Sequence, residues 1–478
     1  MTIACLFFFA LRRKIGLRER MVLAQALGSD SYSGIVSLVR NILRGTAAVE
    51  GAGALILFFR FLPEFGFGKA LWYGVFHSIS AFCNAGFDVL ADTDVGGSLC
   101  RYATDPVVNF TIMALIIIGG LGFMSAATLV IFLFRRKVGL RQRMLIAQAL
   151  SLNEMDGVVR LQRMVIFGSL GFEAAGALIL TLWFWPQYGF VRALRWGVFH
   201  SISAFCNAGI DLMGIRIPFS SLTLYAANPL VNLVIMALII IGGIGFLTWE
   251  DIRSNHLHFS RYRMQSKVIL SATALLITIP AFLFYLTDFA DLPVGERILA
   301  SLFQSVTPRT AGYNTVDLTE MTDASQAVTI LLMLTGGAPG STAGGMKVTT
   351  LAVLIANAIA AFRRREDPQL FHRRLETSTV RNAAAILLLY LGLTFAGAAV
   401  ISTAEELPLG ACLYETASAA GTVGLTLGLT PQLGVLSQSI LILLMYFGRV
   451  GGLTLIYAAF SGHDLTYARY PQEKITVG

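Results

Sequence analysis

The chain has 478 residues, of which 55% are hydrophobic and only 13% are charged. A soluble domain usually carries about 25% charged residues, so this composition excludes an ordinary soluble protein and favours an integral membrane protein. Basic residues number 36 against 28 acidic ones, but they stand in short runs between apolar windows, the pattern of cytoplasmic loops in a multi-pass protein of the cell membrane. We therefore expect a lipid bilayer around the chain and no nucleic acid among its partners.

The N-terminal segment, residues 1–27, is expected to be the truncated end of a membrane helix followed by a basic cytoplasmic linker. Only about ten apolar residues precede its basic cluster, whereas a signal peptide places the charge before the apolar run. Farther along, the uncharged windows at 106–134, 268–287 and 382–403 each reach the roughly 20 residues that span a bilayer. The five cysteines lack metal-ligand spacing, so we expect free thiols.

Residues 28–134 and 135–252 contain a tandem duplicate. FHSISAFCNAG occurs at 76–86 and at 199–209, and one offset of 123 residues also aligns Glu50 with Glu173 without a gap. The stretch before each glycine has about 14 residues, too few to cross about 30 Å of hydrocarbon at 1.5 Å per residue. We interpret it as a half-helix that enters the membrane and returns. The two glutamates are interpreted as structural, reaching interfacial water or a backbone donor.

A looser version of the same unit recurs at 253–365 and at 366–478. The third unit carries FQSVTPRTAGYNTVDL and the fourth carries ETASAAGTVGLTLGLT. The sequence thus predicts an all-α integral membrane protein, in which four pseudo-repeats of helix, re-entrant pore half-helix with loop, and helix surround one central pore. Basic runs follow the second spans, whereas acidic residues follow the third glycine, so the loops are expected to face the outside. Those acids either concentrate cations or are simply solvated.

The second span of the third unit is interrupted by GGAPGSTAGG at 336–345. Each glycine costs a helix about 1 kcal/mol and a proline about 3, so this stretch is predicted to leave the helix and to border a cavity. In the fourth unit Arg449 lies within an apolar span, where a guanidinium usually faces a pore or a partner. A structural salt bridge is the alternative for Arg449.

One glycine closes each half-helix. A half-helix whose C-terminus points at the pore presents the negative end of its dipole and free carbonyl groups, which favour a cation, and glycine reaches positive φ at little steric cost. Any one of these glycines alone is more simply a turn or a packing contact, but equivalent places in four units predict a cation site. Thr422-Val423-Gly424 also matches the start of the potassium-channel filter motif.

These motifs resemble those of the Trk/Ktr/HKT family of potassium transporters, most closely the bacterial Ktr-type membrane subunit. The likeness runs from about residue 124 to the C-terminus and includes GGAPGSTAGGMKV, MYFGRVGGLT and PQEKITVG. It implies a pore selective for K⁺ and no cofactor bound by this chain. Na⁺ as an activator or co-ion is compatible with the resemblance. It further implies a homodimer and a separately encoded cytoplasmic ring of nucleotide-binding regulatory subunits.

The resemblance also implies which residues carry the function. A selectivity filter whose backbone carbonyls bind K⁺ is expected at Cys83, Asn84, Ala85, Gly86, Cys206, Asn207, Ala208, Gly209, Thr310, Ala311, Gly312, Thr422, Val423 and Gly424. A gate, formed by an intramembrane loop and an arginine, is expected at Gly336, Gly337, Gly340, Ser341, Thr342, Gly344, Gly345, Lys347 and Arg449. No catalytic residue is expected, since the spans show neither paired carboxylates nor a serine and histidine pattern.

The first unit departs from the family, because it copies the second unit where the family has a loop ending more like Thr-Gly. RRKIGLRERM at 12–21 and RRKVGLRQRM at 135–144 both resemble the linker between the family's first two domains. We hypothesise a crossover within residues 116–123, either natural or an error of sequence assembly. Two alternatives stay open. The chain is an inactive paralogue, or it transports Na⁺ or both K⁺ and Na⁺; the four filter glycines argue against Na⁺ transport.

Overall fold

A computed structural model of the protein describes residues 35–90, 99–122, 158–213, 221–256 and 258–450. The predictions for residues 1–27, for both basic linkers and for the C-terminal PQEKITVG lie outside these residues. Within them the chain is helical apart from one short hairpin, β1 (Gln369–Leu370) paired antiparallel with β2 (Arg373–Arg374). The sequence had not predicted this hairpin, which lies among the arginines that follow the third unit.

The first two units begin in the same way. Helix α3 (Ile35–Phe82) bends at Gly66, where a φ of 71° interrupts it, so one arm is a long span and the other is the half-helix. In the second copy α7 (Val158–Tyr188) is separated from the half-helix α8 (Phe190–Phe205) at Gly189, whose φ is 75°. Glycine permits this backbone, so the same residue divides span from half-helix twice.

The second helix of each copy begins with a side-chain cap. Asp105 accepts hydrogen bonds from the amides of Val107 and Val108 at the start of α4 (Pro106–Leu121). Asn228 caps α9 (Pro229–Gly243) in the same way. Proline follows both caps, at a position where a helix needs no amide donor. The chain then turns by 97° between α9 and α10 (Phe246–Asn255), a bend that the sequence had not indicated.

The third and fourth units repeat the plan. The third contains α11 (Met264–Leu286), the half-helix α12 (Val294–Val306), α13 (Asp323–Leu334) and α14 (Val348–Phe362). The fourth contains α15 (Thr377–Glu405), the half-helix α16 (Leu409–Gly421) and α17 (Val435–Val450). The single-turn 3₁₀ helices are Cys100–Tyr102, Thr223–Tyr225, Phe259–Arg261, Leu318–Glu320 and Thr430–Gln432. The GGAPGSTAGG segment separates α13 from α14 and is not helical.

Four helices in the described part of the chain are long and apolar enough to cross a membrane. They cover Arg44–Phe82, Val159–Tyr188, Met264–Leu286 and Thr377–Glu405, and the bent pair α9 and α10 would make a fifth. Large apolar side chains on these helices, such as Phe59, Leu178 and Leu388, are exposed, which suits contact with lipid rather than water.

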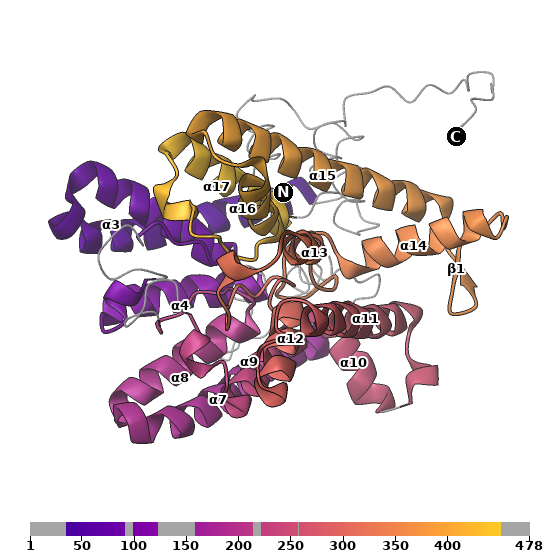
Figure 1. Ribbon diagram of the computed structural model, residues 1–478, viewed down its shortest axis with the longest axis horizontal. Helices are drawn as coiled ribbons and strands as arrows, with labels where there is room; N and C mark the ends of the chain where they lie inside the picture. Colours follow the sequence, from indigo (N-terminus) through magenta and orange to yellow (C-terminus); the bar gives the residue numbers. More distant parts are fainter. Residues whose placement is uncertain (1–34, 91–98, 123–157, 214–220, 257, 451–478) are drawn as a thin grey trace.

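The four units close into a circle. Helix α4 of the first unit contacts α8 of the second, α9 contacts α12 of the third, α13 contacts α16 of the fourth, and α17 returns to α3. Figure 1 shows α16 and α17 beside α3, although they stand at opposite ends of the described chain, while α14 carries the β1 hairpin away from the body. The half-helices therefore end inside the circle.

Candidate functional site

The four glycines at the half-helix ends lie together. A Cβ built on Gly86 would lie 3.2 Å from the Cα of Gly424, and one built on Gly209 would lie 2.9 Å from the Cα of Gly312. Gly86 and Gly209 are also joined, because the same Cβ on Gly86 would lie 2.7 Å from the carbonyl oxygen of Ala208. The structure thus brings one glycine from every unit to a common centre.

The contacts around this centre form a closed ring. Each glycine faces the carbonyl oxygen of the residue that precedes the glycine of another unit. Built Cβ atoms would meet these oxygens at 2.7 Å (Gly86 to Ala208), 2.5 Å (Gly209 to Ala311), 2.1 Å (Gly312 to Val423) and 2.6 Å (Gly424 to Ala85). Any side chain at a glycine would therefore strike a backbone oxygen. We call these four carbonyls the carbonyl ring.

Left-handed backbone gives each loop its shape. The glycines have φ of 74°, 65°, 81° and 91° at Gly86, Gly209, Gly312 and Gly424, and the residue two positions earlier is left-handed as well, at Asn84, Asn207, Thr310 and Thr422. Such a conformation is uncommon for residues other than glycine. The same left-handed turn recurs at the same place in four units, so it is part of the fold of each unit.

The side chains of the predicted loop residues bond between units. The amide nitrogen Nδ2 of Asn84 donates to the carbonyl oxygen of Cys206 at 2.6 Å, and that of Asn207 donates to the hydroxyl of Thr310 at 3.1 Å. Cys83 and Cys206 are buried free thiols, as are the other cysteines among the described residues. The two asparagine side chains therefore link the loops of the first, second and third units.

A hydroxyl within or directly after each half-helix also holds its loop, a contact that the sequence had not indicated. The hydroxyls donate to the carbonyl just beyond the glycine in three units, from Ser80 to Phe87 at 2.8 Å, from Ser203 to Ile210 at 2.7 Å and from Thr307 to Tyr313 at 2.5 Å. In the fourth unit the amide of Gly424 instead donates to the hydroxyl of Ser418 at 3.0 Å. The sequence feature that indicates this contact is a serine or threonine five or six residues before each of the four glycines.

The segment 336–345 contacts the ends of two half-helices, α8 and α16. The hydroxyl of Thr342 donates to the carbonyl of Phe205, the last residue of α8, at 3.1 Å. A Cβ on Gly344 would lie 2.0 Å from the hydroxyl of Thr422 at the end of α16. Its two ends are joined by the amide of Gly336, which donates to the carbonyl of Met346 at 2.7 Å. The segment is therefore a closed loop in contact with the second and fourth units.

Two cations hold this loop. Lys347 donates from Nζ to the carbonyl of Ala343 at 2.7 Å. The guanidinium of Arg449 donates to the carbonyl of Thr342 in the loop and to the carbonyl of Gly119 in α4. Among the described residues Arg449 has no acidic partner, so the salt bridge weighed as its alternative role is not seen. Arg449 instead connects the loop to the first unit.

The glutamates of the long spans have structural contacts, but their partners are not the interfacial water or backbone donors that the sequence suggested. Glu50 and Glu173 are buried, rather than at interfacial water. Glu50 accepts a hydrogen bond from the hydroxyl of Tyr446 at 2.5 Å, and Glu173 accepts one from the thiol of Cys206 at 3.5 Å. These donors come from other helices, which sequence periodicity could not reveal. Both acids therefore belong to the packing around the half-helices.

Comparison with known proteins identifies the family to which this architecture belongs. A family described as TrkH, cation transport protein, matches residues 1–126 and again residues 117–464. The chain belongs to this family. It is 35% identical over 454 residues to the potassium/sodium uptake protein NtpJ of Enterococcus hirae, covering 93% of this chain and 98% of that protein. It is 36% identical over 373 residues to the Ktr system potassium uptake protein B of Bacillus subtilis, covering 77% and 82%.

A solved structure agrees with the fold. The crystal structure of the potassium transporter TrkH from Vibrio parahaemolyticus matches with a TM-score of 0.68 at 17% identity, covering 88% of this chain and 84% of that one. The predicted family, the all-α membrane fold and the multi-pass location in the cell membrane are thereby confirmed. The family is one of cation transporters, which agrees with the expectation that the chain is not an enzyme.

Proposed function

We propose that the chain is the pore-forming subunit of a potassium uptake system, with the carbonyl ring as part of its selectivity filter. The observation that carries this proposal is the ring itself, in which one backbone oxygen from every unit approaches a shared centre. Carbonyl oxygens can replace the hydration shell of K⁺. The half-helix C-termini around the ring add the negative ends of their dipoles, so a cation is favoured there.

The loop at 336–345 is the proposed gate. It contacts the ends of two half-helices. Lys347 and Arg449 bind the loop through its carbonyls, so that their positive charges can oppose a cation leaving the filter or hold the loop in position. Because Arg449 binds the loop and α4 at once, movement of the loop requires those contacts to break. Arginine suits this role, since its planar fork donates in two directions.

The proposed partners are a second copy of this chain and a cytoplasmic ring of nucleotide-binding regulatory subunits. Relatives at 36% and 27% identity are named as proteins B and D of a Ktr system, a wording that fits an assembly of several components. The transported ion is K⁺, bound through the filter backbone, and no cofactor is needed for that binding.

Sodium is the second candidate for the transported or activating ion. The relative from Enterococcus hirae is named a potassium/sodium uptake protein, which favours Na⁺ as a co-ion or a mixed cargo. A glycine next to each carbonyl of the ring favours K⁺, because no side chain at these four positions crowds the carbonyl oxygens. Competition of unlabelled Na⁺ and K⁺ against rubidium flux separates these two candidates.

Gly424→Ser tests the filter. The new Cβ would lie 2.6 Å from the carbonyl oxygen of Ala85. This clash adds to the strain of about 1–3 kcal/mol that any side chain at positive φ brings, so we expect rubidium uptake to fall about tenfold or more. Gly428→Ser is the matched control, because Gly428 also has a positive φ, 87°, but has open space around its Cβ position.

Both variants are measured in cells that lack potassium uptake and in vesicles. The intact chain is expected to restore growth at low K⁺ and to take up rubidium. A correctly folded dimer without uptake would contradict transport and favour an inactive paralogue. Equal losses in Gly424→Ser and Gly428→Ser would contradict the role of the ring.

A further inference from the structure

Each half-helix carries a buried polar residue directly after an aromatic residue. The four residues are His77, His200, Gln304 and Glu415, and each is at most 1% exposed. A buried polar side chain is normally hydrogen-bonded, because leaving it without a partner costs free energy. In three of the four units its partner lies two or three residues after the glycine of the carbonyl ring. The position therefore connects the half-helix before the ring to the chain that leaves the ring.

The two histidines make this connection through Nε2. That of His77 lies 2.7 Å from the carboxylate oxygen Oδ1 of Asp88, and that of His200 lies 3.2 Å from the amide nitrogen of Leu212. The second copy also carries an aspartate, Asp211, at the place of Asp88. In both copies one ring nitrogen thus reaches the chain that follows the glycine.

Glu415 makes the connection with both oxygens of its carboxyl group. Oε1 accepts hydrogen bonds from the hydroxyl of Thr426 and from the amide of Leu427 at 3.2 Å. Oε2 accepts one from the hydroxyl of Thr430 at 2.7 Å. For Gln304 of the third unit, by contrast, neither polar atom of the side-chain amide has a partner among the described residues. From this position, the fourth half-helix thus holds its outgoing chain at three residues.

The carbonyl of Val423 has a central place in the ring. Its oxygen would lie 2.1 Å from a Cβ built on Gly312, 3.1 Å from one built on Gly209 and 3.2 Å from one built on Gly86. This oxygen is therefore close to the glycines of all three other units. A displacement of the fourth loop would change the distances around the whole ring.

Glu415 and a second residue of α16, Ser418, hold the fourth loop on both sides of its glycine. The amide of Gly424 donates to the hydroxyl of Ser418 at 3.0 Å, and Glu415 binds the residues that follow. In the other three units a hydroxyl holds the carbonyl just beyond the glycine. The fourth loop therefore relies on Glu415 for the segment that those hydroxyls hold elsewhere.

We propose that Glu415 is a positioning residue of the filter, which keeps the carbonyl of Val423 at the distances from its neighbours that favour K⁺ over Na⁺. Carbonyl oxygens replace the hydration shell of K⁺, and Na⁺ is the smaller ion, so a loosened loop accepts Na⁺ more readily. Glu415 does not touch the ion and acts through Thr426 and Leu427. The inference rests on the proposed function, because it concerns the ion preference of that same ring.

The test measures the concentrations of Na⁺ and of K⁺ that halve rubidium uptake into vesicles. The ratio of the Na⁺ to the K⁺ concentration reports the ion preference and does not depend on how much of the protein is folded. Glu415→Met, which has a similar length but no carboxyl oxygens, should lower this ratio severalfold. Glu415→Gln should keep it, because the amide oxygen accepts from Thr426 and Leu427 while the amide nitrogen donates to the hydroxyl of Thr430.

Gln304→Met is the matched control, because it removes a polar group from the equivalent buried place and breaks no hydrogen bond among the described residues. It should leave the ratio unchanged. Thr430→Val removes one donor and should lower the ratio less than Glu415→Met, and the double variant should be no worse than Glu415→Met alone. Elution in detergent shows whether each variant is folded. If Glu415→Met does not fold, an unchanged ratio in Thr430→Val overturns the inference.

Thermal unfolding in detergent gives a readout that does not need transport. K⁺ should protect the intact chain more than Na⁺ does, and Glu415→Met should lose that difference while Gln304→Met keeps it. An unchanged K⁺ preference in Glu415→Met, or an equal loss in Gln304→Met, would overturn the inference. No rubidium uptake by the intact chain, together with a protection by K⁺ that Glu415→Met abolishes, would instead contradict the proposed transport. An intact chain with neither uptake nor protection would contradict both.

Discussion

The two copies of the repeat share one backbone but not one set of neighbours. Gly66 and Gly189 bend the chain alike, and Ser80 and Ser203 fix the following loop alike. These contacts lie within a unit, so identical residues reproduce them. Contacts between units differ, because the first copy adjoins the fourth unit and the second copy adjoins the third. A duplicated sequence therefore repeats its local structure and gains new partners from its place in the circle.

The two copies differ most clearly near the C-terminal ends of α4 and α9. Gly119 and Gly242 occupy equivalent places in α4 and α9, and a Cβ on either would lie 1.9 Å from the last carbonyl of its half-helix. The carbonyl of Gly119 accepts from the guanidinium of Arg449, whereas that of Gly242 accepts from the amide of Thr342 at 3.2 Å. One copy thus contacts the loop at 336–345 directly, and the other does so through an arginine.

The largest effect is expected from substitutions that test whether both copies contribute equally to the carbonyl ring. Gly86→Ala would place a Cβ 2.7 Å from the carbonyl of Ala208, and Gly209→Ala would place one 2.5 Å from that of Ala311. The clash with a neighbouring carbonyl adds to the strain of a side chain at positive φ, so we expect each variant to lose about ten- to hundredfold of rubidium uptake. Gly122→Ala, at a positive φ with open space, is the control. If only Gly209→Ala is impaired, the first copy does not contribute to the pore.

The sequence predicted the parts of the site that repeat. A glycine after each short apolar stretch, and the break at 336–345, could be read from spacing and helix propensity. The hydrogen-bond partners could not, because Tyr446 is 396 residues from Glu50 and Arg449 is 330 from Gly119. The partners of the two copied histidines were equally hidden, because His77 contacts Asp88 whereas His200 contacts the amide of Leu212, although the second copy carries Asp211 at the place of Asp88.

A smaller effect compares the two buried glutamates. Tyr446→Phe removes the hydroxyl that donates to Glu50, whose other oxygen already has no partner among the described residues. Leaving a buried acceptor without its donor costs about 1–3 kcal/mol, so the thermal unfolding midpoint in detergent should fall. Cys206→Ala removes only a thiol, a weak donor, from Glu173 and should cost less. Equal losses would show that the two carboxylates do not differ in their dependence on these donors.

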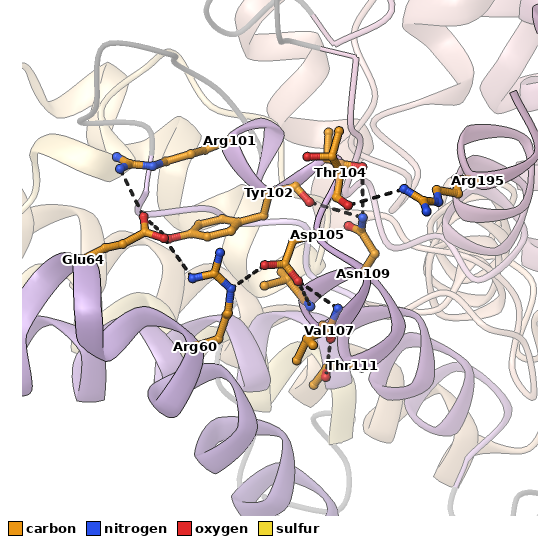
Figure 2. Close-up of polar contacts among 12 residues, drawn as sticks. Arg60, Glu64, Arg101, Tyr102, Thr104, Asp105, Val107, Asn109, Thr111 and Arg195 are labelled. Carbon is orange, nitrogen blue, oxygen red and sulfur yellow. Dashed lines mark hydrogen bonds and ion pairs between the residues drawn. The ribbon is translucent and has the colours of Figure 1, made fainter. Parts of the chain in front are cut away.

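The two copies also differ in charge where α4 and α9 begin. Figure 2 shows Arg60 of α3 reaching Asp105, the cap of α4, beside a second group in which Glu64 binds Tyr102 and Arg101. The second copy has Trp183 in place of Arg60 and Asn228 in place of Asp105. Both caps hold the first amides of the following helix, so capping is common to the copies and the ion pair belongs to the first alone.

The smallest expected effect separates these two roles of Asp105. Asp105→Asn imports the residue of the second copy, which should keep the cap and lose the ion pair with Arg60. The Arg60 side chain is 35% exposed, so the loss should be about 0.2–1 kcal/mol and should shrink as salt is added. Asp105→Ala should lose about 1 kcal/mol more, because the cap goes as well. Asn228→Ala removes a cap without an ion pair, so its loss in thermal unfolding should not change with salt. A salt-dependent loss in Asn228→Ala would mean that the copies differ by more than this one pair of charges.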